Sequence, residues 1–180
     1  RIKWTTRDEE LVVFWMNRHQ NVLKLLQTNA IDGSSKLLYE EKNKYYIDIT
    51  DDWYFLKSGE QYLFTSEMGG YNGLYLYARN GKKTTLTKMN YDVTEVNAID
   101  EKNSLVYYTL AYPTPMDRAL FVTDFSGKRT YRLSSEAGYR NFVFNDDYTR
   151  FYERFTTINT PQKVTLYSIV KNKGKITAAS

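Results

Sequence analysis

Few residues in this sequence could do acid–base or nucleophilic chemistry. His19 is the only histidine and cysteine is absent, so a Ser-His-Asp triad would need His19 as its general base. No serine stands in the Gly-x-Ser-x-Gly turn that exposes a nucleophile. One histidine without cysteine also argues against a zinc site. We therefore expect no catalytic residue in this chain, and we expect His19 at a strand end with a structural hydrogen bond.

The acidic residues offer weak candidates for binding. Glu40 and Glu41 could hold a cationic amine, but the charged stretch Glu40–Lys44 reads as a link between two structural units, so we expect both to be solvated. Three aspartates could give oxygen ligands to calcium: Asp48, Asp51 and Asp52. They lack the spacing and the glycine of a calcium loop, so we expect neither a metal nor another cofactor. Asp146-Asp147 is typical of a hairpin turn.

Composition excludes several classes of protein. The chain has 180 residues, and its net charge of +4 is spread without a long basic run, which argues against a nucleic-acid binder. No apolar run approaches the roughly 18 residues of a membrane span. Aromatic residues reach 16%, with 17 tyrosines, which is typical of a β-protein. The sequence opens at Arg1 in a strand-like stretch, so we interpret it as a fragment whose targeting signal, if it has one, lies upstream.

The elements that would position these residues repeat along the chain. Leu74, Leu120 and Leu166 follow one another at intervals of 46 residues (120 − 74 and 166 − 120), and so do Gly81 and Gly127. A period of that length with several strands per unit is typical of a β-propeller. Asn80-Gly81 and Asp32-Gly33 between apolar runs indicate hairpin turns.

The turn signals divide the sequence into short strands. The expected strands are Ile2–Thr6, Leu11–Asn17, Val22–Gln27, Lys36–Glu41, Trp53–Lys57, Gln61–Glu67, Gly73–Arg79, Lys83–Thr87, Val93–Ile99, Ser104–Leu110, Ala119–Phe125, Thr130–Ser134, Arg140–Phe144, Arg150–Thr156, Val164–Val170 and Lys175–Ala178. They predict an all-β chain of about four four-stranded antiparallel blades, approximately 1–41, 45–88, 91–134 and 138–179. Leu74–Tyr77 is apolar on both alternating faces, which favours a blade between two others, with a two-layer sandwich as the alternative.

Several segments resemble one family in order and spacing. Trp15–Asn21 resembles the W-hydrophobic-N-R-x-Q-N strand of the dipeptidyl peptidase IV family, in the prolyl oligopeptidase clan. Further segments follow in the order of that family: Tyr45–Asp48, Phe64–Glu67, Gly70–Asn72, Leu74–Tyr77, Leu86-Thr87 and Tyr91–Thr94. The resemblance covers nearly the whole chain, through to Leu166-Tyr167.

The resemblance implies the second half of an eight-bladed propeller that sits over an α/β-hydrolase domain. Such serine exopeptidases remove dipeptides from the N-terminus of peptides, and their propeller gates access and helps bind substrate. The catalytic triad would follow Ser180, and the glutamate pair that holds the substrate amine would precede Trp15. We therefore carry over no catalytic, substrate-binding or metal-binding residue. The implied partners are the peptide substrate and the hydrolase domain of the same parent chain, and the implied location is periplasmic or extracellular.

Two other functions stay open from the sequence. The chain could be a stand-alone propeller that acts as a binding scaffold, or the propeller of a related oligopeptidase or acylaminoacyl peptidase. The units at the two ends, with Trp4 and Trp15 in the first and Phe151 and Tyr167 in the last, should each expose an apolar face. We therefore expect the isolated chain to associate with itself through these faces, for example as a homodimer.

Overall fold

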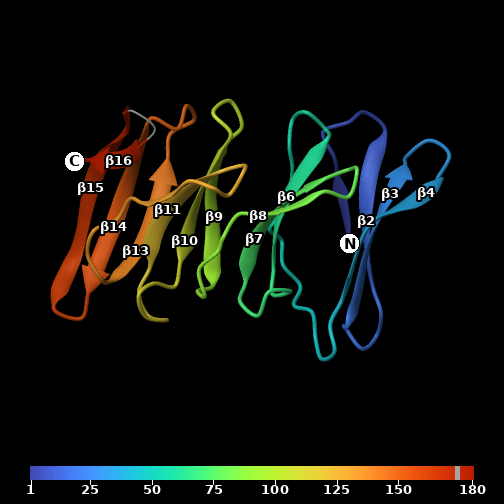
Figure 1. Ribbon diagram of the computed structural model, residues 1–180, viewed down its shortest axis with the longest axis horizontal. Coiled ribbons are helices and arrows are strands. Elements are labelled where there is room, and N and C mark those ends of the chain that lie inside the picture. Colours follow the sequence, from blue (N-terminus) through green and yellow to red (C-terminus); the bar gives the residue numbers. More distant parts are fainter. Residues whose placement is uncertain (173–174) are drawn as a thin grey trace.

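The computed structural model describes residues 1–172 and 175–180, which form sixteen β-strands (Figure 1). The strands are β1 (Ile2–Trp4), β2 (Glu10–Met16), β3 (Val22–Asn29), β4 (Ser35–Lys42), β5 (Trp53–Phe55), β6 (Gln61–Ser66), β7 (Gly73–Ala78), β8 (Lys83–Thr85), β9 (Val93–Asp100), β10 (Leu105–Leu110), β11 (Ala119–Asp124), β12 (Thr130–Arg132), β13 (Tyr139–Phe144), β14 (Arg150–Thr157), β15 (Thr160–Asn172) and β16 (Lys175–Ala179). They form four four-stranded sheets in chain order, and neighbouring strands are antiparallel. The predicted all-β fold of four such units is confirmed.

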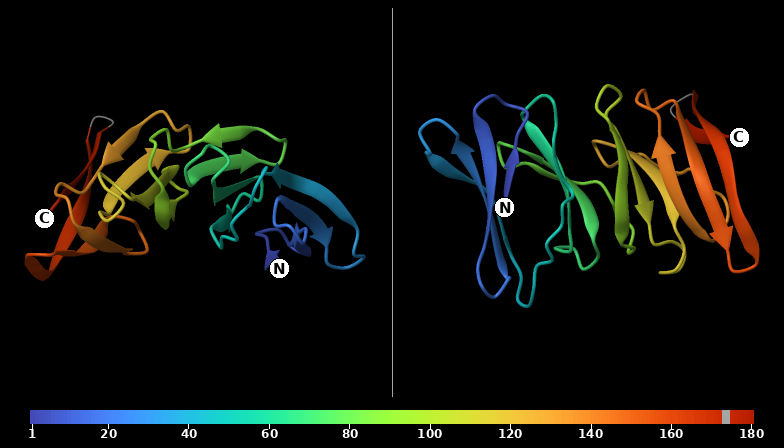
Figure 2. Two further views of the ribbon diagram at one scale, coloured as in Figure 1. Left: turned by 90° about the horizontal axis from the view of Figure 1, so that it is seen from below. Right: turned by 180° about the vertical axis from the view of Figure 1, so that it is seen from behind.

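The four sheets lie one after another along the long axis of the molecule. We call them the first to the fourth sheet, from β1–β4 to β13–β16. Figure 2 shows from below that they follow an arc. Among the described residues, no helix is long and apolar enough to cross a membrane.

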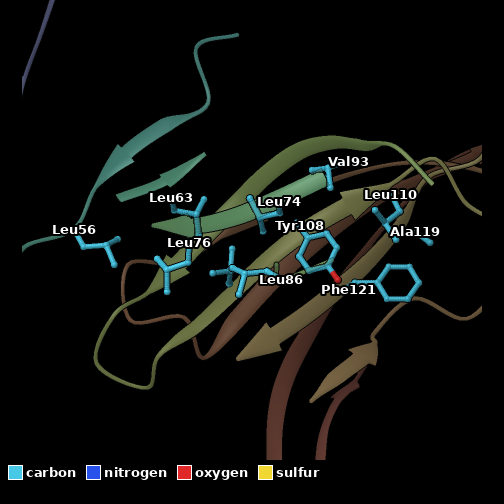
Figure 3. Packing of buried hydrophobic residues seen from close by; sticks show 11 residues of the cluster. Leu56, Leu63, Leu74, Leu76, Leu86, Val93, Tyr108, Leu110, Ala119 and Phe121 are labelled. Carbon is cyan, nitrogen blue, oxygen red and sulfur yellow. The ribbon is translucent and has the colours of Figure 1, made fainter. Parts of the chain in front are cut away.

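Each gap between neighbouring sheets is filled by a separate apolar cluster. Figure 3 shows the cluster between the second and third sheets, where Leu74 and Leu76 of β7 meet Tyr108 and Phe121. Tyr75, also on β7, points the other way and packs in the cluster with the first sheet. The alternating side chains of one strand thus enter two cores, because successive residues of a strand face opposite sides. This excludes the two-layer sandwich, in which each sheet buries only one face.

Most other strand ends differ from the predicted bounds by one or two residues, and three further differences bear on the site and on the ends of the molecule. The strand β4 continues to Lys42, one residue beyond the predicted strand Lys36–Glu41, so Glu40 and Glu41 lie inside the strand as predicted, and the interpretation of Glu40–Lys44 as a linker is wrong for Glu40 to Lys42. The strand β15 begins at Thr160, four residues earlier than expected, and it contains Pro161 next to a shift in its register with β14. Proline is tolerated in strands at such irregularities because no ladder hydrogen bond is lost there.

The third difference concerns the apolar face expected at the end of the fourth sheet. Phe151 is buried against the third sheet, and Tyr167 is partly buried and packs against the same cluster, so neither contributes to the exposed face. The exposed apolar residues of that face are instead Val143, Val164, Leu166 and Val170. Trp4 and Trp15 are exposed at the other end, as expected.

Candidate functional site

The turns and connections of the chain divide between two edges of the molecule. In a four-stranded antiparallel sheet, the turn between the second and third strands lies at the same edge as the segment that leaves the fourth strand. We call this the connecting edge. It holds residues 17–21, 43–52, 67–72, 86–92, 111–118, 133–138 and 158–159, several of which run along the bottom of Figure 1. The remaining turns form the opposite edge.

A cavity of about 610 Å³ opens at the connecting edge between the first and second sheets. Segment 43–52, which joins β4 to β5, forms one wall of the cavity. The backbone of this segment is tied to the β2–β3 turn, because the Asn43 and Ile47 amides donate to the carbonyls of Asn21 and Gln20. The side chain of Ile47 is buried in the core, which fixes the middle of the segment.

The floor of the cavity is aromatic and apolar. Trp53 stacks flat on Phe64 with 4.2 Å between ring centroids, and Phe14 meets Trp53 edge-on. Phe14, Leu23 and Trp53 contribute surface to the cavity. Since Trp53 packs in the core on its other side, the floor is held rigidly by both sheets.

The most buried charged residue that lines the cavity is Glu41, which is only 8% exposed. Its two carboxylate oxygens accept hydrogen bonds of 2.8 Å from the hydroxyls of Tyr39 and Ser66. Burial and the nearby Glu41 raise the pKa of Tyr39, so this phenol stays protonated and donates. The expectation that Glu41 is solvated is therefore wrong, because β4 turns this side chain toward the second sheet.

More carboxylates stand around the cavity, from Asp48, Asp51, Glu67 and Asp92. Only Asp51 has a cationic partner among the described residues, since its side chain pairs with Arg1. The Arg1 guanidinium also lies over the Phe14 ring, 4.7 Å from its centroid. The cavity thus combines an aromatic floor with an excess of negative charge.

The other candidates from the sequence do not form a site of their own. His19 is exposed in the β2–β3 turn, and its expected hydrogen bond is not formed within the described part of the chain. Asp48, Asp51 and Asp52 are near in sequence, but no group of acidic or histidine side chains in residues 1–172 and 175–180 could hold a metal ion. Asp147 accepts the Thr149 amide at 3.1 Å, which confirms the predicted hairpin turn.

Sequence reasoning missed the cavity for an identifiable reason. It forms between two sheets, and its lining comes from segments as far apart as Phe14 and Asp92. One local signal of the site existed in the sequence. Tyr39 and Glu41 are two residues apart on β4, so their side chains lie on the same face of the strand.

Comparison with known proteins agrees with this architecture. The sequence profile of the family "Dipeptidyl peptidase IV (DPP IV) N-terminal region" matches residues 1–162. Dipeptidyl peptidase 4 of Arthroderma otae is 28% identical over 188 aligned residues, which cover 97% of this chain and 23% of that protein. The crystal structure of Porphyromonas gingivalis dipeptidyl peptidase 4 superposes with a TM-score of 0.83 at 28% identity, over 93% of this chain and 24% of that one.

The chain therefore spans about a quarter of the length of these relatives. The profile match covers far more than half of the chain, and the fold agrees with that of the solved relative. The chain belongs to the dipeptidyl peptidase IV family and carries part of its N-terminal β-propeller region.

Proposed function

We propose that this chain is the non-catalytic propeller portion of a dipeptidyl-peptidase-IV-like serine exopeptidase. In this proposal the connecting edge faces an α/β-hydrolase domain of the same parent protein, and the cavity helps bind the peptide substrate. The sequence holds no Gly-x-Ser-x-Gly turn that would expose a nucleophilic serine, so we assign catalysis to the hydrolase domain. By the same resemblance we propose a periplasmic or extracellular location.

The observation that carries the proposal is the distribution of exposed apolar side chains. Among the described turns and connections, the connecting edge exposes six large hydrophobic residues: Tyr45, Tyr46, Ile49, Tyr71, Met116 and Ile158. The described part of the opposite edge exposes only Ile31. A concentration of exposed apolar surface on one face marks an interaction site. The cavity opens on that same face, where a peptide held by the hydrolase domain would reach it.

The test compares the two edges in the full-length protein. We expect the double variant Tyr71→Asp/Met116→Asp to lower kcat/KM for a Gly-Pro chromogenic amide by about tenfold or more, because the new charges would disrupt the apolar contact with the hydrolase domain. A tenfold loss corresponds to about 1.4 kcal/mol. The single variant Met116→Asp should also lower kcat/KM, and its matched control is Ile31→Asp, which places one carboxylate at an exposed apolar position on the opposite edge. Limited proteolysis should show faster separation of the domains for the double variant alone. Equal effects at both edges would contradict the proposal.

The isolated chain should show no peptidase activity of its own. Purified chain that releases a chromophore from the Gly-Pro amide, and loses this activity on His19→Ala substitution, would overturn the assignment of catalysis to another domain.

A further inference from the structure

We infer that the cavity between the first and second sheets binds the basic side chain, lysine or arginine, of a peptide. The inference deepens the proposed function, on which it rests for the source of the peptide. The cavity itself, its charge and its floor are features of this chain.

The unbalanced charge of Glu41 is the first support. A carboxylate that is nine-tenths buried is normally matched by a cation, because removing it from water is costly. Within the described residues, Glu41 has two neutral hydroxyl donors and no cationic partner. Its charge faces a cavity large enough for a ligand, since ligand pockets commonly measure about 300–1,000 Å³.

The positions of the other carboxylates favour an organic cation over a metal ion. Asp48, Glu67 and Asp92 also line the cavity without a cationic partner in the described part of the chain. No three of these groups come together as metal ligands would in the described residues. An organic cation, which needs only one carboxylate at its charged end and accepts others at longer range, fits this arrangement.

The apolar floor indicates that the cation carries an aliphatic stem. Lysine and arginine bury their methylene groups against apolar surface while the charged head reaches a polar group. Phe14, Leu23 and Trp53 provide such a surface beside Glu41. Aromatic rings also attract a cation placed over their faces.

Arg1 shows within this chain that the lining accepts a guanidinium. Its side chain lies over Phe14, pairs with the Asp51 carboxylate and donates to the Thr50 carbonyl at 2.6 Å. These are contacts of the type proposed for the ligand, made by a residue that lines the cavity. The more buried carboxylate, Glu41, remains for a second cation.

Calorimetry on the full-length protein with three small probes tests this inference. The probes are Nα-acetyl-lysine amide, which keeps the charged side-chain ammonium, its neutral counterpart Nα-acetyl-norleucine amide, and n-butylamine, which has the aliphatic stem and the charge without the peptide unit. We expect the lysine probe to bind at least tenfold more tightly than each of the other two. Norleucine binding as well as lysine would overturn the charge recognition, and butylamine binding as well as lysine would overturn the assignment to a peptide.

Variants assign the effect to the cavity. Glu41→Gln keeps the size and the acceptor oxygen, and it should weaken binding of the lysine probe at least tenfold without changing the norleucine affinity. Asp48→Asn/Glu67→Gln, at more accessible positions of the lining, should weaken it about threefold, and this variant decides the matter if Glu41→Gln does not fold. Glu40→Gln is the matched control, because the adjacent Glu40 points to the other side of β4, between Lys24 and Lys42. Unchanged lysine affinity in the cavity variants would refute the inference.

The binding experiment and the peptidase assay test the inference and the proposed function independently. A protein that cleaves dipeptides yet binds lysine and norleucine probes equally would refute only the inference. A protein without peptidase activity that still binds the lysine probe through Glu41 would refute only the proposed function.

Discussion

At the scale of single residues, Asp124 shows how one carboxylate holds a turn. Its side chain accepts hydrogen bonds from Arg129 at 2.9 Å, from the Ser126 hydroxyl at 2.7 Å and from the Lys128 amide at 3.1 Å. Burial works to raise the pKa of Asp124, but these donors outweigh it and lower the pKa from 3.8 to about 2. The ionised form of Asp124 therefore stabilises the folded chain.

The lowered pKa of Asp124 predicts a specific acid sensitivity. Because the folded-state pKa lies below the unfolded value, the stabilisation is fully present above about pH 4 and is lost as the pH falls through about 2. Asp124→Asn should lower the urea midpoint near neutral pH, and its difference from the parent should shrink between about pH 4 and 2. Urea unfolding as a function of pH measures this. A difference that stays constant down to pH 2 would contradict the role of the carboxylate charge.

Glu40 and Glu41 mark the limit of prediction at this scale. They are neighbours in the sequence, but the pleat of β4 sends Glu40 to lysines and Glu41 to the cavity. Ser66, which donates to Glu41 from another sheet, is 25 residues away in the chain. The sequence shows that two acidic residues stand at these positions. It does not show what surrounds Glu41, because its surroundings depend on how two sheets pack.

At the scale of elements, two equivalent turns provide a matched pair of glycines. Gly81 and Gly127 both have positive φ angles, 86° and 64°. A Cβ atom on Gly81 would meet nothing within 4 Å, whereas one on Gly127 would lie 2.4 Å from the Thr85 carbonyl oxygen. The turn at Gly127 thus packs closely on β8 of the neighbouring sheet, and the turn at Gly81 stands free.

This contrast predicts different costs for the same substitution. Gly81→Ala should lower the free energy of unfolding by about 1–2 kcal/mol, the cost of placing a side chain in the left-handed region. Gly127→Ala should cost clearly more, because the backbone of β8 must also shift. Chemical denaturation of both variants compares them directly, and equal losses would show that the contact with Thr85 does not constrain the turn.

The central strands predict a larger effect of core substitutions. Leu76 on β7 is 3% exposed and packs between the second and third sheets. Leu76→Ala should cost about 2–5 kcal/mol, the usual range for a buried leucine. Lys82→Ala, in the exposed turn that follows, should stay within about 0.5 kcal/mol. A Leu76→Ala variant that unfolds at the urea concentration of its parent would disagree with the burial of this strand.

The strands were predictable because their signals are local. Turn residues such as Asn80-Gly81 indicate where a strand ends, and a continuous apolar run such as Leu74–Tyr77 indicates a strand that is buried on both faces. The start of β15 was less predictable, since Pro161 is a residue that often interrupts strands, whereas pairing with β14 extends the strand to Thr160. Pairing across a sheet overrides a local breaker where the register is already irregular.

At the scale of the whole molecule, the two end sheets each leave one face uncovered by the rest of the described chain. Cross-strand pairing aligns Ile2, Val13, Leu26 and Leu37 in one apolar row over all four strands of the first sheet. Ile2 and Leu37 are 61% and 55% exposed. On the fourth sheet, Val143, Tyr152 and Leu166 form a similar row. Repeat units of this kind need a neighbour on each side to bury both faces.

These faces predict that the isolated chain self-associates through its end sheets. Exposed apolar rows favour association because contact removes their surface from water. Leu37→Lys should weaken the association, since it places a charge in the row of the first sheet, while Ile31→Lys puts the same charge on an exposed residue of the β3–β4 turn and should leave it unchanged. Light scattering behind a size-exclusion column measures the mass over a range of concentrations. A monodisperse species of 21.2 kDa at every concentration would refute the association and would require the end faces to be covered within one chain.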